Sequence, residues 1–347
     1  MTSTENIGWF ADISLADRPT VGGKGGSLGE LTSAGIAVPP GFVVRTNAFH
    51  HVLQALEKDA PVRSAVEALD DGDLDRIVSV SSELQMRIEN SPLPKDVEDE
   101  ILAAHALLCS AGTPIAVRSS ATTEDAEDAS FAGLQDTYLW IMGAEATLRH
   151  VRACWASLYS VASIAYRRKR GLPEAGVAMA VVVQQMVDAR VAGVLFTRSP
   201  LTGDKSVITV EGAWGLGSAV VGGEVTPDRF VIGKITGDIS TRDISDKHVE
   251  HRPVQGGGVR EVPVHHALRK APCLSDEDLQ RLRETGRKIE RHYGRAQDIE
   301  WAIDQSGAIF ILQSRPETVW SAKERGPVAK PEDDPRAHVM TIFGGRR

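Results

Sequence analysis

Two carboxylates, an amide and a guanidinium alternate along a short stretch near the end of the chain. Residues 298–303 and 309–315 are predicted to be strands that a turn at 304–307 joins into a hairpin. Pairing Asp298 with Gln313 across this turn collects four polar side chains on one face, namely Asp298, Glu300, Gln313 and Arg315. Carboxylate and amide oxygens suit Mg²⁺, and an Arg makes paired hydrogen bonds to phosphate. The face therefore indicates a magnesium-nucleotide site, and the alternative is a hairpin with one solvated, charged face.

The other face of the same hairpin carries hydrocarbon side chains. In the predicted register these are Ile299, Trp301, Ile303, Phe310 and Leu312. We expect this face to pack in the core.

Two cationic residues elsewhere in the chain are candidates for binding phosphate. Lys24 lies among glycines, in residues 22–27, at the start of a predicted helix, where exposed N–H groups and the helix dipole favour an anion. Gly25 follows Lys24, so this is not the G-x-x-x-x-G-K-[ST] phosphate loop, and a purely structural turn is the alternative. Arg118 ends a predicted strand at 115–118, where a surface ion pair is an equal alternative.

Two further segments could enclose a nucleotide. Residues 130–137 combine Gly, small side chains and hydroxyls, as a mobile flap over a triphosphate requires, with an ordinary surface loop as the alternative. The apolar strand at 181–187 ends where the backbone of two residues could recognise adenine, although a plain core strand also fits. The candidate contacts in these two segments are Gly133, Gln135, Thr137, Gln184, Met186 and Val187. A glycine cluster at 212–217 would also let backbone approach a ligand, but alone it is weak.

The elements that must position these residues change in character along the chain. Amphipathic helices are predicted up to residue 170, the longest at 145–169, and strands from 177 onward, at 177–187, 192–197, 207–211 and 230–235. Ser275 and Asp278 predict a capping box at the start of a later helix. We expect a mixed α and β fold (α+β or α/β), in which residues 1–190 and 191–320 form two parts and 321–347 a linker and tail.

The composition excludes several classes of function. The chain has 347 residues and a net charge of −8, without the concentrated positive charge that binding to nucleic acid or a membrane surface needs. Its three cysteines have no paired spacing, so neither a disulfide framework nor a zinc site is expected. No segment is long and apolar enough to cross a bilayer, and the N-terminus has no basic segment followed by an apolar one. We expect a cytoplasmic protein.

Seven motifs occur in the order of a known family. They are VGGKGGSLGEL, VPPGFVV, AVRSSATTED, SFAGLQDT, QQMVDARVAGVLFT, EGAWGLGSAVVGGEVTPD, and DIEWAI with LQSRPET. The sequence resembles the ATP-binding domain of pyruvate phosphate dikinase, phosphoenolpyruvate synthase and rifampin phosphotransferase from about residue 22 to 318. The resemblance implies an ATP-grasp fold whose two lobes enclose the nucleotide.

The resemblance also implies roles for individual residues. Residues at the positions of Lys24, Arg118 and Arg315 hold the phosphates of ATP in that family. Those matching Glu300 and Gln313 bind Mg²⁺, with Asp298 alongside. ATP and Mg²⁺ are therefore the expected cofactors.

Relatives of this family pass phosphate from ATP to a histidine on a swivelling domain, and from there to an acceptor, releasing AMP and phosphate. That histidine follows Ser or Thr, whereas none of the ten histidines here does. We therefore expect an ATP-binding subunit whose partner carries the phosphohistidine and phosphorylates a small acceptor, in an arrangement that resembles phenylphosphate synthase and enzymes acting on phenols or cresols. The alternatives are a ligase that forms an acyl phosphate, a non-catalytic nucleotide-sensing subunit, and a piece of a longer rifampin-phosphotransferase-like enzyme. The apolar residues 338–343 are a candidate docking segment.

Overall fold

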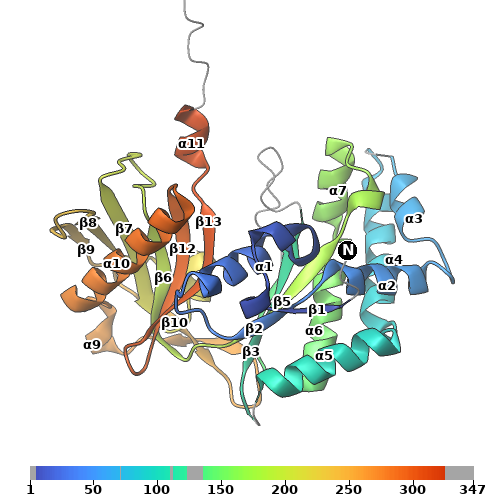
Figure 1. The fold of residues 1–347 in the computed structure, drawn as a ribbon, viewed down its shortest axis with the longest axis horizontal. Coiled ribbons are helices and arrows are strands. Elements are labelled where there is room, and N and C mark those ends of the chain that lie inside the picture. Colours follow the sequence, from blue (N-terminus) through green and yellow to red (C-terminus); the bar gives the residue numbers. More distant parts are fainter. Residues whose placement is uncertain (1–4, 71, 110–111, 123–135, 325–347) are drawn as a thin grey trace, which may run out of the picture.

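Two antiparallel sheets organise the chain, each with helices packed against it (Figure 1). The structure is a computed structural model that describes residues 5–70, 72–109, 112–122 and 136–324. Gly133, Gln135 and the segment 338–343 therefore lie outside the described residues. Within the described residues no helix combines the length and the apolar character needed to cross a membrane.

The first sheet has five strands in the order β1-β2-β5-β3-β4. Their bounds are β1 Ile7–Trp9, β2 Gly41–Val44, β3 Ile115–Ala121, β4 Thr137–Ile141 and β5 Met179–Gln185. The central strands are apolar on both faces because both faces are covered. Val43 and Val182 pack against α1 (Arg18–Ser33), whereas Phe42 and Val183 pack in a larger core on the opposite face.

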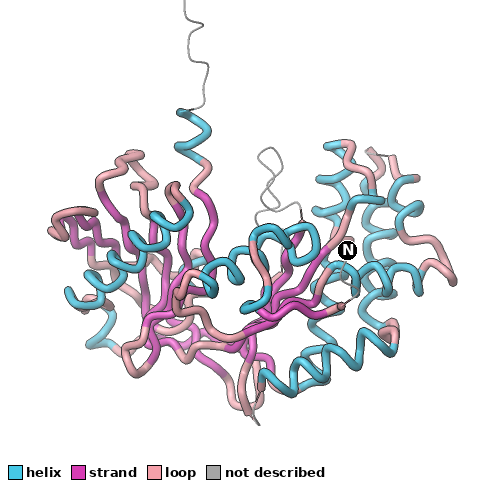
Figure 2. Tube along the Cα trace, in the orientation of Figure 1, coloured by secondary structure: helices cyan, strands magenta, loops and turns pink. Residues whose placement is uncertain are grey.

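The helices of this larger core lie on one side of the first sheet (Figure 2). They are α2 Thr46–Leu56, α3 Arg63–Glu67, α4 Leu74–Asn90, α5 Lys95–Leu108, α6 Ala144–Ser157 and α7 Val161–Arg170. The prediction of one long helix at 145–169 was wrong, because α6 and α7 are separate. The chain is extended at Ser160, whose hydroxyl accepts a hydrogen bond from the Ser163 N–H at 3.3 Å and so caps a new helix.

The second sheet has six strands in the order β13-β12-β6-β7-β8-β9. Their bounds are β6 Ala189–Phe196, β7 Val207–Trp214, β8 Asp228–Gly233, β9 Ile239–Asp243, β12 Gln297–Asp304 and β13 Ile309–Pro316. Helix α10 (Asp276–Tyr293) covers one face and begins at the predicted capping box of Ser275 and Asp278. Its Leu279 and Leu282 pack with Trp301 of the sheet.

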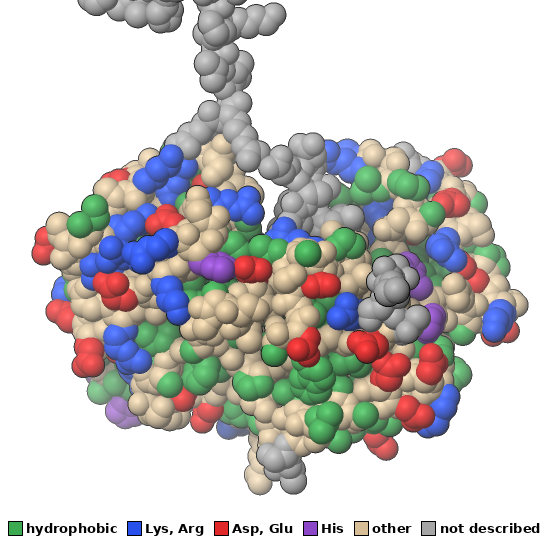
Figure 3. Space-filling model, viewed as in Figure 1, with side chains coloured by type: hydrophobic (Ala, Val, Ile, Leu, Met, Phe, Trp, Pro, Cys, Tyr) green, Lys and Arg blue, Asp and Glu red, His purple; other side chains and the backbone are tan. Residues whose placement is uncertain are grey.

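Smaller elements complete the described chain. They are the 3₁₀ turns η1 Phe10–Asp12, η2 Leu15–Asp17 and η3 Glu174–Gly176, the strand pair β10 Val249–Pro253 and β11 Val259–Pro263, and the short helices α8 Ser218–Val221, α9 His266–Arg269 and α11 Val319–Glu324. On the face seen in Figure 3, basic side chains gather over α10 with acidic side chains among them. The exposed Lys and Arg residues of α10 are Arg281, Lys288 and Arg291, and the exposed Arg295 follows the helix.

Helix α1 joins the two sheets. Its Leu28 belongs to the core of the first sheet, and its Leu31 belongs to the core of the second. The Ser27 hydroxyl donates a hydrogen bond to the carbonyl of Ser314 in β13 at 2.6 Å. Residues at the start of the chain are thereby held beside the last hairpin.

The hairpin β12–β13 forms as predicted, but its register differs. Asp298 pairs with Arg315, and Glu300 pairs with Gln313. A β-bulge then leaves Leu312 without a direct partner, because Trp301 pairs with Ile311. The four polar residues still share one face. The prediction that Phe310 and Leu312 lie on the core face with Trp301 was wrong, because both pack in a separate cluster with Ala302.

Candidate functional site

A cavity of about 370 Å³ lies between the two sheets and brings distant parts of the sequence together. Of the twelve predicted site residues, nine line it, namely Lys24, Arg118, Thr137, Gln184, Met186, Val187, Glu300, Gln313 and Arg315. Asp298 lies beside it, paired with Arg315. The mixed α and β class and the two-part enclosure that the ATP-grasp expectation implies are both confirmed.

A kink in α1 directs Lys24 into the cavity. At Gly22 the backbone has φ 70° and ψ 179°, which interrupts α1. A first turn from Arg18 precedes this kink, and the helix resumes at the glycine run, where its start was predicted. A Cβ at Gly22 would lie 2.2 Å from the carbonyl oxygen of Ser120 in β3. The Ser120 hydroxyl donates to the Val21 carbonyl at 2.9 Å and accepts from the Gly25 N–H at 3.2 Å. The glycine run is therefore packed tightly against β3, and Lys24 is only 9% exposed.

Arg118 reaches from β3 of the first sheet to the hairpin of the second. One of its terminal nitrogens donates to Glu300 Oε2 at 3.0 Å and to Gln313 Oε1 at 2.8 Å. The other donates to the Leu312 carbonyl at 2.9 Å. This carbonyl belongs to the residue that the bulge leaves without a direct partner. A buried arginine thus holds the two predicted metal ligands together.

Asp298 is a half-buried carboxylate, and only one of its two oxygens has a nearby partner. Its Oδ2 lies 3.6 Å from Nε of Arg315, and its Oδ1 is buried without a hydrogen-bond partner among the described residues. Burial raises the pKa of Asp298 to about 6, the charge of Arg315 lowers it, and the charge of Glu317 raises it. A cation at this edge of the cavity would compensate the carboxylate.

The opposite end of the cavity is apolar and is suited to a flat ring. Val187, Ala192 and Leu216 pack there in one cluster with Leu312. Of the backbone groups of Met186 and Val187 that were predicted to recognise adenine, the Met186 N–H already donates to the Pro114 carbonyl at 3.0 Å. The Gln184 amide donates to the Pro39 carbonyl at 3.3 Å, so its side chain is also held by the protein.

The sequence did not single out every residue that lines the cavity. Gly193 of β6 lines it, and a Cβ there would lie 1.9 Å from the Glu211 carbonyl oxygen. Gly217 and Ser218 also line it, at the start of α8. The glycine cluster at 212–217 was the available signal for them, but alone such a cluster is too common to assign a site.

The model of the family described as "Pyruvate phosphate dikinase, AMP/ATP-binding domain" matches residues 18–335. A probable phosphoenolpyruvate synthase of Methanocaldococcus jannaschii is 38% identical over 335 residues, which are 95% of this chain and 28% of that protein. A rifampicin phosphotransferase of a Streptomyces species is 40% identical over 326 residues, which are 93% of this chain and 36% of that protein. The chain thus spans about a third of the length of these relatives. Among solved structures, D-alanyl-alanine synthetase A of Vibrio cholerae has a TM-score of 0.26 at 11% identity, covering 69% of this chain and 54% of that one, a likeness too low to argue from.

Proposed function

This chain belongs to the family of pyruvate phosphate dikinase AMP/ATP-binding domains, and on that premise we propose that its cavity binds ATP and that the bound ATP phosphorylates a histidine outside these residues. The observation that carries the proposal is the convergence of Lys24, Arg118 and Arg315 on one cavity with Glu300 and Gln313. These residues come from α1, β3 and the β12–β13 hairpin. A fold that only needed a core would not require three cations and a carboxylate at one internal surface.

The two ends of the cavity give ATP one orientation. The adenine would lie at the apolar end, where the Met186 carbonyl and the Val187 N–H can recognise its edge and Leu312 can contact its face. The phosphates would lie at the other end, against the ammonium of Lys24 and the guanidinium groups of Arg118 and Arg315. Thr137 adds a hydroxyl at the cavity wall, and we propose phosphate contacts for Gly133 and Gln135 as well.

Mg²⁺ fits the donor set on the hairpin. Glu300 and Gln313 are register partners, and an oxygen of each accepts from the same Arg118 nitrogen. The half-buried Asp298 beside them has one buried oxygen, Oδ1, without a hydrogen-bond partner among the described residues. When bound, Mg²⁺ would neutralise charge on the phosphates, with Glu300 and Gln313 as its ligands and Asp298 alongside.

In this proposal the chain catalyses transfer by positioning and charge neutralisation. The three cations hold the phosphates and stabilise the charge that develops as a histidine attacks in line. No histidine of the described residues lines the cavity, so the nucleophile comes from elsewhere. We propose a partner subunit that carries this histidine and a site for a small acceptor such as a phenol or cresol. The histidine would attack the β-phosphorus, so that the bond to the AMP oxygen breaks and AMP leaves, and water would then hydrolyse the terminal phosphoryl group to phosphate.

One experiment tests this function. The chain is incubated with ATP and Mg²⁺, with and without the polypeptide that copurifies with it, and AMP, ADP and acid-labile phosphoprotein are measured. We expect phosphohistidine on the partner and AMP, and both only when the partner is present. ADP formation from ATP, a small acid and an amine without a partner would instead support a ligase. ATP binding with neither product would support a nucleotide-sensing subunit.

Arg118 and a metal ion should compete for the same two oxygens when ATP is absent. Replacing Arg118 by Met removes the cation that compensates Glu300. We expect the variant to bind Mn²⁺ about tenfold more tightly without nucleotide and ATP at least about tenfold more weakly. Electron paramagnetic resonance of Mn²⁺ and calorimetry measure the two affinities. The control is Arg229→Met, which breaks the partly exposed pair with Asp243. Unchanged Mn²⁺ affinity in Arg118→Met would contradict the proposed competition.

A further inference from the structure

A buried network lies immediately after the last residue of the candidate site. We propose that Arg198, Glu317 and Trp320 form a positioning network that holds Arg315 in place to bind the phosphates of the nucleotide. This inference rests on the proposed function, because it assigns Arg315 to a bound nucleotide. None of the three residues lines the cavity, so they are positioning residues rather than catalytic ones.

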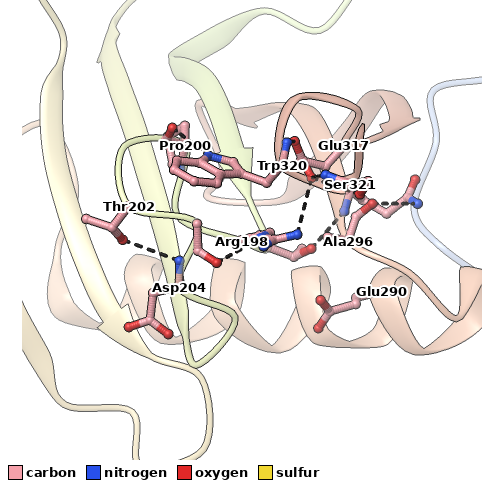
Figure 4. A network of polar contacts seen from close by, with 12 residues as sticks. Arg198, Pro200, Thr202, Asp204, Glu290, Ala296, Glu317, Trp320 and Ser321 are labelled. Carbon is pink, nitrogen blue, oxygen red and sulfur yellow. Dashed lines mark hydrogen bonds and ion pairs between the residues drawn. The ribbon is translucent and has the colours of Figure 1, made fainter. Parts of the chain in front are cut away.

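Arg198 is the centre of the network (Figure 4). It follows β6, is 5% exposed, and lies 3.8 Å from Oε2 of Glu317, which is 8% exposed. Its Nε donates to the Gly203 carbonyl at 2.8 Å, and its guanidinium carbon lies 5.9 Å from the centre of the Trp320 ring. A buried charge is retained only when it is paired and hydrogen-bonded, as this one is.

Trp320 closes the network on the other side. Its indole N–H donates to the Pro200 carbonyl at 3.0 Å. A Cβ at Gly203 would lie 2.7 Å from the Trp320 ring, so the loop between β6 and β7 fits closely against the indole. The network thus joins α11 to that loop.

Glu317 ties the network to the chain just beyond Arg315. Its carboxylate accepts a hydrogen bond from the backbone N–H of Trp320 at 2.7 Å. It also accepts hydrogen bonds from the backbone N–H of Ser321 at 3.2 Å and from the Ser321 hydroxyl at 3.1 Å. Its own N–H donates to the Ala296 carbonyl at 3.0 Å. The side chain and the backbone of Glu317 are therefore both fixed.

Arg315 needs this support because little else fixes it. It lies near the end of β13, an edge strand that pairs only with β12, and its side chain is 56% exposed. On its N-terminal side, Ser314 is fixed by Ser27 and by a hydrogen bond to Gln297 at 2.9 Å. On its C-terminal side, the fixed point is Glu317. When the backbone on both sides of Arg315 is fixed, its side chain loses less conformational entropy on binding the nucleotide.

The test is a double-variant cycle on nucleotide affinity. Calorimetry measures binding of Mg-ATP and of AMP to the unaltered chain, Glu317→Gln, Arg315→Met and the double variant. We expect Glu317→Gln to lower the affinity for ATP about tenfold and the affinity for AMP less than about twofold. When Arg315 is already replaced, Glu317→Gln should lower the affinity for ATP less than about twofold. If Glu317→Gln folds poorly, Trp320→Phe replaces it in the test. This substitution keeps an aromatic ring but removes the indole N–H and the five-membered ring that carries it, and we expect a milder version of the same pattern, with ATP affinity about threefold lower.

The control is Glu290→Gln, the same substitution in a second ion pair, which is partly buried. Glu290 bonds Lys234 at 2.9 Å, and Figure 4 shows it close to the network but not joined to it. We expect a loss of thermal stability there without a selective loss of ATP affinity. The inference is overturned if Glu317→Gln lowers the affinities for ATP and AMP equally, or if it lowers ATP affinity equally with and without Arg315. Either result leaves the proposed function standing. Failure of the unaltered chain to bind ATP overturns both.

Discussion

Replacing Glu300 by Gln is expected to lower phosphoryl transfer to the partner by about 10³-fold, the scale of losing one charge-stabilising group in an active site. The side chain keeps its shape but loses the negative charge that we propose binds Mg²⁺. The fold should be unaffected, because Gln can still accept the hydrogen bond from Arg118. Single-turnover transfer measures the loss, and thermal unfolding tests the fold.

Glu211→Gln is the matched control for this prediction. Glu211 lies in β7, pairs with Arg229 across the strands, and does not line the cavity. Burial raises the pKa of Glu211, as expected for a half-buried carboxyl. Transfer should be unchanged in Glu211→Gln. If transfer were also unchanged in Glu300→Gln, the metal assignment would be wrong.

Replacing Gly22 by Ala should have the second large effect, on both folding and binding. The new Cβ would lie 2.2 Å from a backbone oxygen of β3, at a φ of 70° that side chains disfavour. We expect a loss of roughly 2–4 kcal/mol of unfolding free energy, typical of forced backbone strain and overpacking. Because the loop also positions Lys24, ATP affinity should fall by at least about tenfold. Urea unfolding and calorimetry measure the two losses.

Gly35→Ala separates the two contributions to the lost unfolding free energy, which are the strain of a positive φ and the clash with β3. Gly35 has a similar φ of 64°, but the nearest atom to its Cβ would be Lys288 Nζ at 3.9 Å. It should therefore show only the conformational cost, about 1 kcal/mol, and normal ATP affinity. Comparable losses of stability in the two variants would contradict the clash at Ser120.

The sequence predicted the polar face of the hairpin because it depends only on local alternation. Asp298, Glu300, Gln313 and Arg315 share a face whichever of the two registers forms, since the β-bulge restores the alternation. The predicted face of the apolar residues beyond the bulge was wrong because of the same bulge. Because the bulge leaves Leu312 unpaired, Phe310 and Leu312 lie on the face opposite to the one predicted. Nothing in the local sequence pattern marks the position of the bulge.

Features that depend on tertiary contacts could not be predicted. The kink at Gly22 reflects the approach of β3, about 100 positions further along the chain. The break between α6 and α7 occurs within an unbroken apolar periodicity, and only the local cap at Ser160 marks it. Arg198 and Glu317 have no sequence pattern that would pair them. The family motifs nonetheless placed most of the cavity residues, because six of the seven motifs contribute residues to its lining.

The most direct test is an experimental structure of the chain with Mg²⁺ and a non-hydrolysable ATP analogue. The account predicts that one triphosphate contacts Lys24 of α1 and Arg315 of β13 at the same time, with the metal on Glu300 and Gln313 and the base beside Val187. A nucleotide bound elsewhere, or one that reaches only the residues of a single sheet, would contradict it.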